Sequence, residues 1–218
     1  MLKAEATWVG QALERMRSEE LSPLLNVGSA TATFRETVQP WISHEIFAPL
    51  ERKGVTVNHL DIQEGDGIDL HGDLTDDAFM ASLGRRGYRS LLCCNVLEHV
   101  DNPAAISRRL EELMPAMGYL IVTVPNRFPY HPDPIDTMFR PDISDLLELF
   151  PRCGLREGKV LDCGTGWDYV DRSPAAMVSK VKRRVRGMKE HGGVKGTTSF
   201  LPWLFRQFRI TCVVLRKR

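Results

Sequence analysis

Long apolar runs are missing from this 218-residue chain. No stretch reaches the roughly 18 consecutive apolar residues that a membrane-spanning helix needs. The N-terminal region carries Glu5, Glu14 and Glu19 and has no apolar core, so it lacks the features of a secretory signal peptide. We therefore expect no transmembrane span and a cytoplasmic protein. A hydrophobic content of 43% suits the core of one ordinary domain.

Cysteine pairs are missing as well. The five cysteines are an odd number, and no CxxC pair occurs among them. This usage argues against a disulfide framework and against a structural zinc site, and it favours a reducing compartment. No cluster of His, Cys and acidic residues has the spacing of a metal site, so we predict no metal. Cys93 and Cys94 are adjacent in an apolar run, where the side chains of a strand point to opposite faces.

Acidic residues are almost absent from the last part of the chain. Residues 172–218 hold 13 Lys and Arg against one acid, whereas the preceding part holds 16 against 27. Residues 176–189 place apolar and basic side chains on different faces of a helix, and an apolar cluster follows at 200–205. This pattern predicts peripheral membrane contact through 176–205, and a solvated helix packed on the domain is the alternative. No recognised nucleic-acid module accompanies the charge, so we expect no nucleic-acid partner.

Hydrophobic periodicity divides the chain into alternating helices and strands. The expected helices cover residues 4–20, 40–52, 76–83, 103–114 and 143–150. The expected strands cover residues 24–27, 55–61, 89–94, 119–124, 158–163 and 208–215. We expect Pro125-Asn126 to stop the strand that precedes it. Strands that alternate with helices predict βαβ units and a mainly parallel sheet.

We expect a single domain over residues 1–218. It begins with an N-terminal helix within residues 1–21. Five prolines make residues 125–141 irregular, and the segment is long enough to be a functional loop. Residues 164–207 form a basic and apolar insertion before the last strand.

Small or polar residues follow three of the predicted strands. Gly28 follows the first strand, Asp61 ends the second, and Asn95 follows residues 89–94. Open α/β sheets bind ligands at the carboxyl ends of their strands, so we expect a site there. The first turn reads Gly28-Ser29-Ala30-Thr31-Ala32 and lacks the G-x-G-x-x-G pattern, which disfavours a nicotinamide dinucleotide.

The three junctions, in this order, resemble those of the class I S-adenosylmethionine-dependent methyltransferases. The segment Asn95-Val96-Leu97-Glu98-His99-Val100 is similar to the small-molecule, type 11-like branch of that family. The resemblance implies a Rossmann-like, doubly wound α/β fold, with a mainly parallel seven-stranded sheet and helices on both faces. It also implies the strand order 3-2-1-4-5-7-6, an antiparallel last strand, and an enzyme with S-adenosylmethionine as its cofactor.

The resemblance further implies which residues contact that cofactor. Asp61 would accept hydrogen bonds from the ribose hydroxyls. Asp73 would accept one from the adenine amino group, and Leu74 would pack against the ring. Ordinary structural roles are the alternatives, namely a turn for Asp61 and a helix N-cap for Asp73. The expected cofactor-binding residues are Asn26, Gly28, Ser29, Ala30, Asp61, Gly72, Asp73, Leu74, Asn95 and Val96.

Acid and imidazole groups on the substrate side are the candidate catalytic residues. Histidine titrates near neutral pH, so His131 or His99 is a candidate base for a substrate hydroxyl, with Glu98 as its helper. Hydrogen bonds to the loop backbone are the alternative for Glu98 and His99. Asp136 and Arg140 are four residues apart, which favours a helical salt bridge between them.

Two functions fit these features. The favoured one is O-methylation of a small-molecule or sugar/glycan-type acceptor, which the basic and apolar segment would allow to be lipid-linked. The alternative is a non-catalytic binding module on the same fold, in which residues 172–205 associate with a membrane or a protein partner. The alanines that stand after Gly28, where the family usually has glycines, motivate this alternative.

Overall fold

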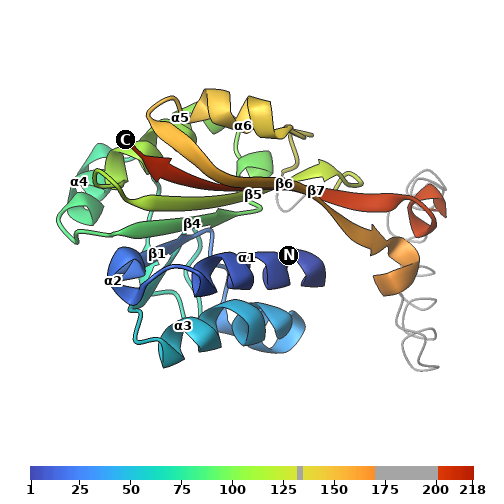
Figure 1. Cartoon of the computed structure of the whole chain (residues 1–218), viewed down its shortest axis with the longest axis horizontal. Helices are drawn as coiled ribbons and strands as arrows, with labels where there is room; N and C mark the ends of the chain where they lie inside the picture. Colours follow the sequence, from blue (N-terminus) through green and yellow to red (C-terminus); the bar gives the residue numbers. More distant parts are fainter. Residues whose placement is uncertain (132–134, 170–200) are drawn as a thin grey trace.

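One seven-stranded sheet organises the chain (Figure 1). The computed structural model describes residues 1–131, 135–169 and 201–218. The strands are β1 (Leu24–Val27), β2 (Val57–Asp61), β3 (Leu70–His71), β4 (Ser90–Cys94), β5 (Tyr119–Arg127), β6 (Cys153–Thr165) and β7 (Gln207–Lys217). The end of β6 and the start of β7, which pair with each other, extend beyond the other strands (Figure 1).

The strand order is β3-β2-β1-β4-β5-β7-β6. β1 lies between β2 and β4 and is parallel to both, and β5 continues the parallel part next to β4. β7 runs antiparallel to β5 and to β6. The predicted fold class, strand order and antiparallel last strand are therefore confirmed. Because β1, β2 and β4 are parallel, the residues that follow them meet at one edge of the sheet.

Helices cover both faces of this sheet (Figure 1). One face carries α1 (Lys3–Glu14), α2 (Ser18–Leu21) and α3 (Ala48–Arg52). The other face carries α4 (Asp77–Gly84), α5 (Pro103–Leu113) and α6 (Ile143–Leu149). Shorter turns are η1 (Phe34–Val38) and η2 (Ser43–Phe47), which are π-helical, and η3 (Leu97–His99), η4 (Gly166–Tyr169) and η5 (Leu201–Leu204), which are 3-10 helical. Within the described ranges, no helix has the length and apolar character to cross a membrane.

The two helical layers bury two apolar clusters, one on each face. Alternate residues of the strands feed them, because successive side chains of a strand point to opposite sides. Leu91 and Cys93 pack with the layer of α4, α5 and α6, whereas Leu92 packs with the layer of α1 and α3. Cys94 also contacts this second cluster, so the two adjacent cysteines face opposite sides as predicted.

The structure corrects several predicted elements. The first helix is shorter than predicted and is followed by the separate turn of helix α2. The segment between the expected strand at 55–61 and the expected helix at 76–83 contains the two-residue strand β3, which extends the sheet at its edge. β6 begins at Cys153, earlier than predicted.

β5 also continues past Pro125 to Arg127, so the prediction that Pro125-Asn126 stops this strand was wrong. The register of β5 with β4 ends at Thr123. Beyond that point β5 has a neighbour only in β7, and proline is tolerated where a strand has become an edge.

Candidate active site

A cavity of about 780 Å³ opens at the carboxyl ends of β1, β2 and β4. The loops after these three strands line it, together with residues 1, 2 and 5 at the N-terminus and the end of β5. All ten residues expected to bind the cofactor lie on its wall. His99 and His131 also line it, whereas Glu98 is fully buried beside it. The structure therefore brings the predicted site residues together around one hollow.

The turn after β1 approaches the loop after β4 closely. Gly28 has a φ of 66°, and a Cβ on it would lie 2.4 Å from Val96 Cγ2. Ala30 also has a positive φ, of 51°, a conformation that is uncommon for a residue with a Cβ. Gly28 therefore serves both the backbone conformation and the contact with Val96.

Gly28→Ala is expected to lower the free energy of unfolding by about 2–3 kcal/mol, since it adds left-handed strain to a steric clash. Val96→Ala in the same chain should recover part of this loss. Gly54→Ala is the matched control, because Gly54 has a φ of 74° with no atom within 4 Å of the added Cβ. Urea unfolding measures all four proteins, and equal losses in the two single glycine variants would contradict the close approach.

Arg35 stabilises the turn after β1 through its side chain, and the sequence analysis did not identify it. The Arg35 side chain is buried and donates hydrogen bonds to the carbonyls of Ser29, Ala30 and Gly67. Burial lowers the pKa of this guanidinium from its usual value. It lies in the π-helical turn η1, and such turns are frequent at functional sites. No short motif in the sequence marks an arginine that binds carbonyls this far along the chain.

Asp61 reaches the cavity from the end of β2. Its Oδ2 accepts a hydrogen bond from the Ala30 amide at 2.8 Å, and its Oδ1 accepts one from the Gln63 amide at 3.0 Å. The carboxylate therefore joins the turn after β1 to the loop after β2. Each carboxylate oxygen can accept a further hydrogen bond, so capacity for a ligand hydroxyl remains.

Asp73 does not cap the following helix, which was the structural alternative for it. The N-cap of α4 is Asp76, whose side chain accepts hydrogen bonds from the amides of Ala78 and Phe79. Asp73 instead accepts a hydrogen bond from the Thr75 amide at 2.8 Å. Its side chain is exposed and lies at the rim of the cavity. Gly72 before it packs under the Phe79 ring, which a Cβ would meet at 2.6 Å.

Asn26 contacts a histidine on the next strand. The Asn26 amide Nδ2 lies 3.0 Å from His59 Nδ1. Burial, and then the charge of Arg35, lower the pKa of His59 to about 4. His59 is therefore neutral at pH 7, and its Nδ1 accepts the hydrogen bond that Asn26 donates. The pair orients the Asn26 side chain on the cavity wall.

Glu5 of α1 contributes a buried carboxylate that sequence reasoning missed. Its Oε1 accepts hydrogen bonds from Asn95 Nδ2 at 2.7 Å and from Thr123 Oγ1 at 2.6 Å. Its Oε2 accepts one from the Leu2 amide. Asn95 has a φ of 55°, so Glu5 stabilises a residue in an uncommon conformation at the end of β4. The two residues are 90 positions apart, and no local pattern announces the contact.

Glu5→Ala is expected to reduce the free energy of unfolding by about 2–4 kcal/mol, because buried hydrogen bonds to a charged group are lost and their donors are left unpaired. Glu14→Ala removes an exposed carboxylate from the same helix and should change it by less than about 0.5 kcal/mol. Denaturant unfolding followed by circular dichroism compares the two. Similar values for both variants would show that Glu5 does not hold Asn95 in place.

Among the candidate catalytic residues, Glu98 lies in the turn η3 with a fully buried side chain. Neither of its carboxylate oxygens has a hydrogen-bond partner among the described residues. Burial raises the pKa of Glu98 to about 8, with the negative charge of Glu5 adding to the effect. The alternative of a hydrogen bond from the loop backbone to the Glu98 side chain therefore reduces, among the described residues, to its own amide, which lowers the pKa by less than burial raises it. It is the Glu98 carbonyl that accepts hydrogen bonds, from the amide and the hydroxyl of Thr137.

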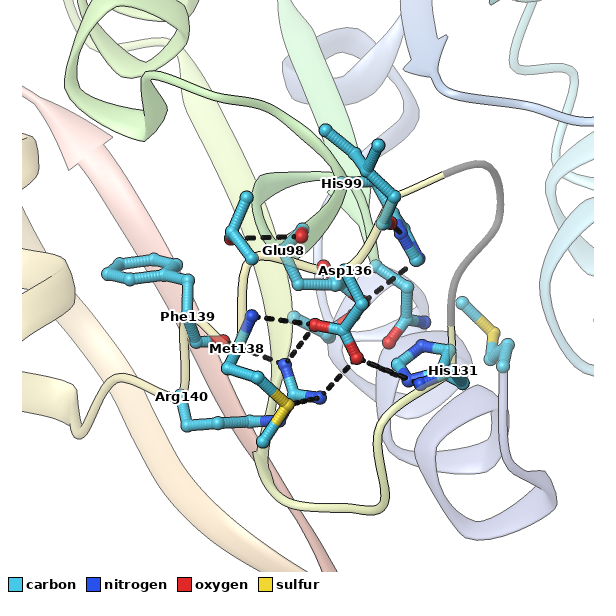
Figure 2. A network of polar contacts seen from close by, with 12 residues as sticks. Glu98, His99, His131, Asp136, Met138, Phe139 and Arg140 are labelled. Carbon is cyan, nitrogen blue, oxygen red and sulfur yellow. Dashed lines mark hydrogen bonds and ion pairs between the residues drawn. The ribbon is translucent and has the colours of Figure 1, made fainter. Parts of the chain in front are cut away.

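Asp136 organises the loop that carries His131 (Figure 2). It accepts hydrogen bonds from both terminal nitrogens of Arg140 and from the amides of His131 and Met138. Burial opposes the ionisation of Asp136, but these hydrogen bonds outweigh it and hold the pKa well below its usual value. The predicted pair of Asp136 and Arg140 is thus present, at 2.7 Å, but in an irregular loop rather than in a helix.

His99 and His131 lie next to each other, with ring centroids 5.1 Å apart. His131 Nδ1 lies 3.1 Å from the Pro129 carbonyl and 3.1 Å from Asp136 Oδ2. Burial lowers the pKa of His131. His99 Nδ1 contacts the Ile135 carbonyl. This is the hydrogen bond to the loop backbone that was the alternative role for His99. Both rings reach the cavity from loops that follow β4 and β5.

The basic insertion lies mostly outside the described residues, including the helix predicted at 176–189. Its described end comprises η5 and Phe205. The Phe205 ring is 79% exposed and stacks on Trp167, with ring centroids 6.4 Å apart. The predicted membrane contact through 176–205 therefore stays a prediction.

Solved structures share this architecture. Coclaurine N-methyltransferase, bound to N-methylheliamine and S-adenosylhomocysteine, is 12% identical, with a TM-score of 0.55 over 98% of this chain and 72% of its own. The [4+2]-cyclase SpnF is 11% identical, with a TM-score of 0.56 over 97% of this chain and 80% of its own. YjhP from E. coli is 14% identical, with a TM-score of 0.53 over 98% and 92%.

No protein-family model matches the sequence, and no curated protein is significantly similar to it. At identities this low, the likeness to solved structures establishes the fold alone. Together with the strand order, it shows that the chain has the Rossmann-like fold of the class I S-adenosylmethionine-dependent methyltransferases.

Proposed function

We propose that this protein is a methyltransferase that uses S-adenosylmethionine and methylates a hydroxyl of a small-molecule or sugar/glycan-type acceptor. The observation that carries the proposal is the cavity at the carboxyl ends of β1, β2 and β4, with Asp61 on its wall. A methyltransferase and a cyclase both occur on this fold, so the residues of the site must carry the argument.

The cofactor side of the cavity supports this proposal. Asp61 has spare acceptor capacity for a ribose diol, and Asp73 lies at the rim for an exocyclic amino group. Leu74 offers an apolar surface to the base. S-adenosylmethionine has no pyrophosphate, so the alanines after Gly28 are compatible with it. When bound, it supplies an electrophilic methyl group on a sulfonium.

The acceptor side carries the groups that handle a proton. His131 donates through Nδ1 to carbonyl or carboxylate oxygens, so its Nε2 keeps a lone pair. The lowered pKa keeps this ring neutral near pH 7, the form that can take a proton. His99 stands beside it, and Glu98 lies behind both. The chain's main contribution is to orient the acceptor oxygen for in-line attack.

An acceptor screen tests the type of reaction. Purified protein is incubated with S-adenosylmethionine and matched sets of hydroxyl compounds, including sugars, and of amines, and release of S-adenosylhomocysteine is measured. Turnover confined to hydroxyl acceptors is the expected result. Turnover with amines alone would contradict O-methylation while leaving the cofactor proposal intact.

His131→Gln is expected to lower kcat on a hydroxyl acceptor by at least about 100-fold without changing the affinity for S-adenosylhomocysteine. His44→Gln serves as the control, because His44 is an exposed histidine beside Glu45 and does not line the cavity. Steady-state kinetics and titration calorimetry separate the two effects. An unchanged kcat would exclude His131 from the proton transfer.

A further inference from the structure

Glu98 is a buried acidic residue whose carboxyl group lacks a hydrogen-bond partner in the described part of the chain. Its side chain has no exposure to solvent, and neither oxygen meets a donor among the described residues. An isolated buried carboxylate is costly unless a proton or a cation compensates it. Arg140, the nearest arginine of this loop, directs its terminal nitrogens to Asp136 instead. Arg140 therefore makes no direct hydrogen bond to Glu98, which leaves a proton or a bound cation to compensate the carboxylate.

His99 narrows the choice. Its Nδ1 faces the Ile135 carbonyl, which can only accept, so Nδ1 carries the hydrogen and Nε2 carries a lone pair. This Nε2 lies 3.7 Å from Glu98 Oε1. A lone pair and a carboxylate oxygen thus face each other across a short gap. Such a gap between two acceptors suits a positive ion.

His131 supplies a third ligand atom of the same kind. Its Nδ1 lies 3.1 Å from the Pro129 carbonyl and from Asp136 Oδ2, both acceptors, so its Nε2 keeps the lone pair. A histidine that donates its other nitrogen to a carboxylate or a carbonyl is the usual arrangement around protein-bound metals. Arg140 in turn fixes Asp136 (Figure 2), so the outer partner of His131 is itself held in place.

One ligand atom from each of Glu98, His99 and His131 lies within 4.8 Å of the other two. Ligand atoms that are each about 2.0–2.2 Å from one zinc ion lie closer to one another than 4.8 Å. Side-chain rotations that move these atoms by about 1 Å would complete the site. We propose that these three residues bind a divalent transition-metal ion. Two imidazoles and one carboxylate form the three-ligand set of open zinc sites.

The position of the site gives the ion a use. His99 and His131 line the cavity, so the remaining coordination position faces it. A hydroxyl oxygen of an acceptor is the chemical class that would complete the coordination, and a bound metal lowers the pKa of such a group. This last step rests on the proposed function. With the ion bound, the Nε2 lone pairs coordinate the metal instead of taking a proton, and the imidazoles act on the acceptor through the ion. This proposal departs from the prediction of no metal that was drawn from the sequence spacing.

Metal binding is measured directly, without any turnover. Chelator-treated protein comprising residues 1–218 is titrated with Zn²⁺ by calorimetry and with Co²⁺ by visible spectroscopy. The expected result is one ion per chain, with an affinity at least about 100-fold lower in Glu98→Gln and in His99→Ala. His44→Ala and His71→Ala are matched controls, since each removes a surface histidine beside a glutamate. Both controls should keep the wild-type affinity.

Absence of a stoichiometric site in folded protein would overturn the proposal. So would equal losses in the two controls, or a thiolate charge-transfer band with Co²⁺, which would place the ion at one of the five cysteines. Circular dichroism of each variant confirms that it is folded. None of these outcomes bears on whether S-adenosylhomocysteine binds, so failure of the metal site and failure of the proposed cofactor are distinguishable.

Discussion

Asp61→Ala is expected to weaken the binding of S-adenosylhomocysteine by at least about 100-fold. Two hydrogen bonds from a ribose diol to a carboxylate are worth roughly 1.5–3 kcal/mol each, and 1.4 kcal/mol corresponds to a factor of ten. The substitution also removes the acceptor for the Ala30 amide, which loosens the turn after β1. Both effects act in the same direction. Isothermal titration calorimetry gives the two dissociation constants.

Asp66→Ala is the matched control for this experiment. Asp66 lies in the loop after β2 and contacts the Thr33 hydroxyl at 3.4 Å, but its side chain does not line the cavity. Its affinity should stay within about threefold of the wild type. Thermal unfolding shows whether Asp61→Ala is still folded. A folded Asp61→Ala protein with unchanged affinity would remove Asp61 from the cofactor site.

The second large effect concerns Glu98 and pH. In metal-free protein, burial raises the pKa of Glu98 from 4.5 to about 8, so the folded state holds a proton that the unfolded state releases. The folded state binds more protons between these two values, and the free energy of unfolding therefore falls as pH rises through them. Each pKa unit corresponds to about 1.4 kcal/mol, so the total is a few kcal/mol. The contribution is complete below pH 4.5 and is lost above about pH 8.

Glu98→Gln removes this titration while keeping the shape of the side chain. Urea unfolding with chelator at pH 5, 7 and 9 is expected to show the variant gaining stability relative to wild type as pH rises. The charges that act on Glu98 from neighbouring elements are those of Glu5, Asp136 and Arg140, and all are kept in the variant. Glu112→Gln, at a half-exposed surface pair with Arg109, should change by less than about 1 kcal/mol over the same range. A constant difference between wild type and Glu98→Gln would contradict the raised pKa.

Much of the fold could be predicted because its signals are local. The apolar run that becomes β4 and the β-branched run that becomes β5 carry strand periodicity in a few adjacent residues. The polar residues at the ends of β1, β2 and β4 could be placed near one another, because parallel strands end at one edge of the sheet. The ends of elements were less predictable. Pro125 stays in a strand because β4 has already ended beside it, which only the register reveals.

The missed parts of the site depend on contacts between distant residues. Glu5 of α1 contacts Asn95 and Thr123, which follow or belong to β4 and β5, and Arg35 contacts the Gly67 carbonyl in the loop after β2. Neither contact leaves a pattern in the neighbouring residues. The proposed metal site likewise has no sequence motif, because Glu98 and His131 come together only where the loop after β5 folds back.

Titration calorimetry of the purified wild-type protein with S-adenosylmethionine and S-adenosylhomocysteine tests the central claim most directly. The account predicts saturable binding of both compounds, with one molecule per chain, in the cavity next to Asp61. Absence of binding of either compound, to protein that circular dichroism shows to be folded, would contradict it.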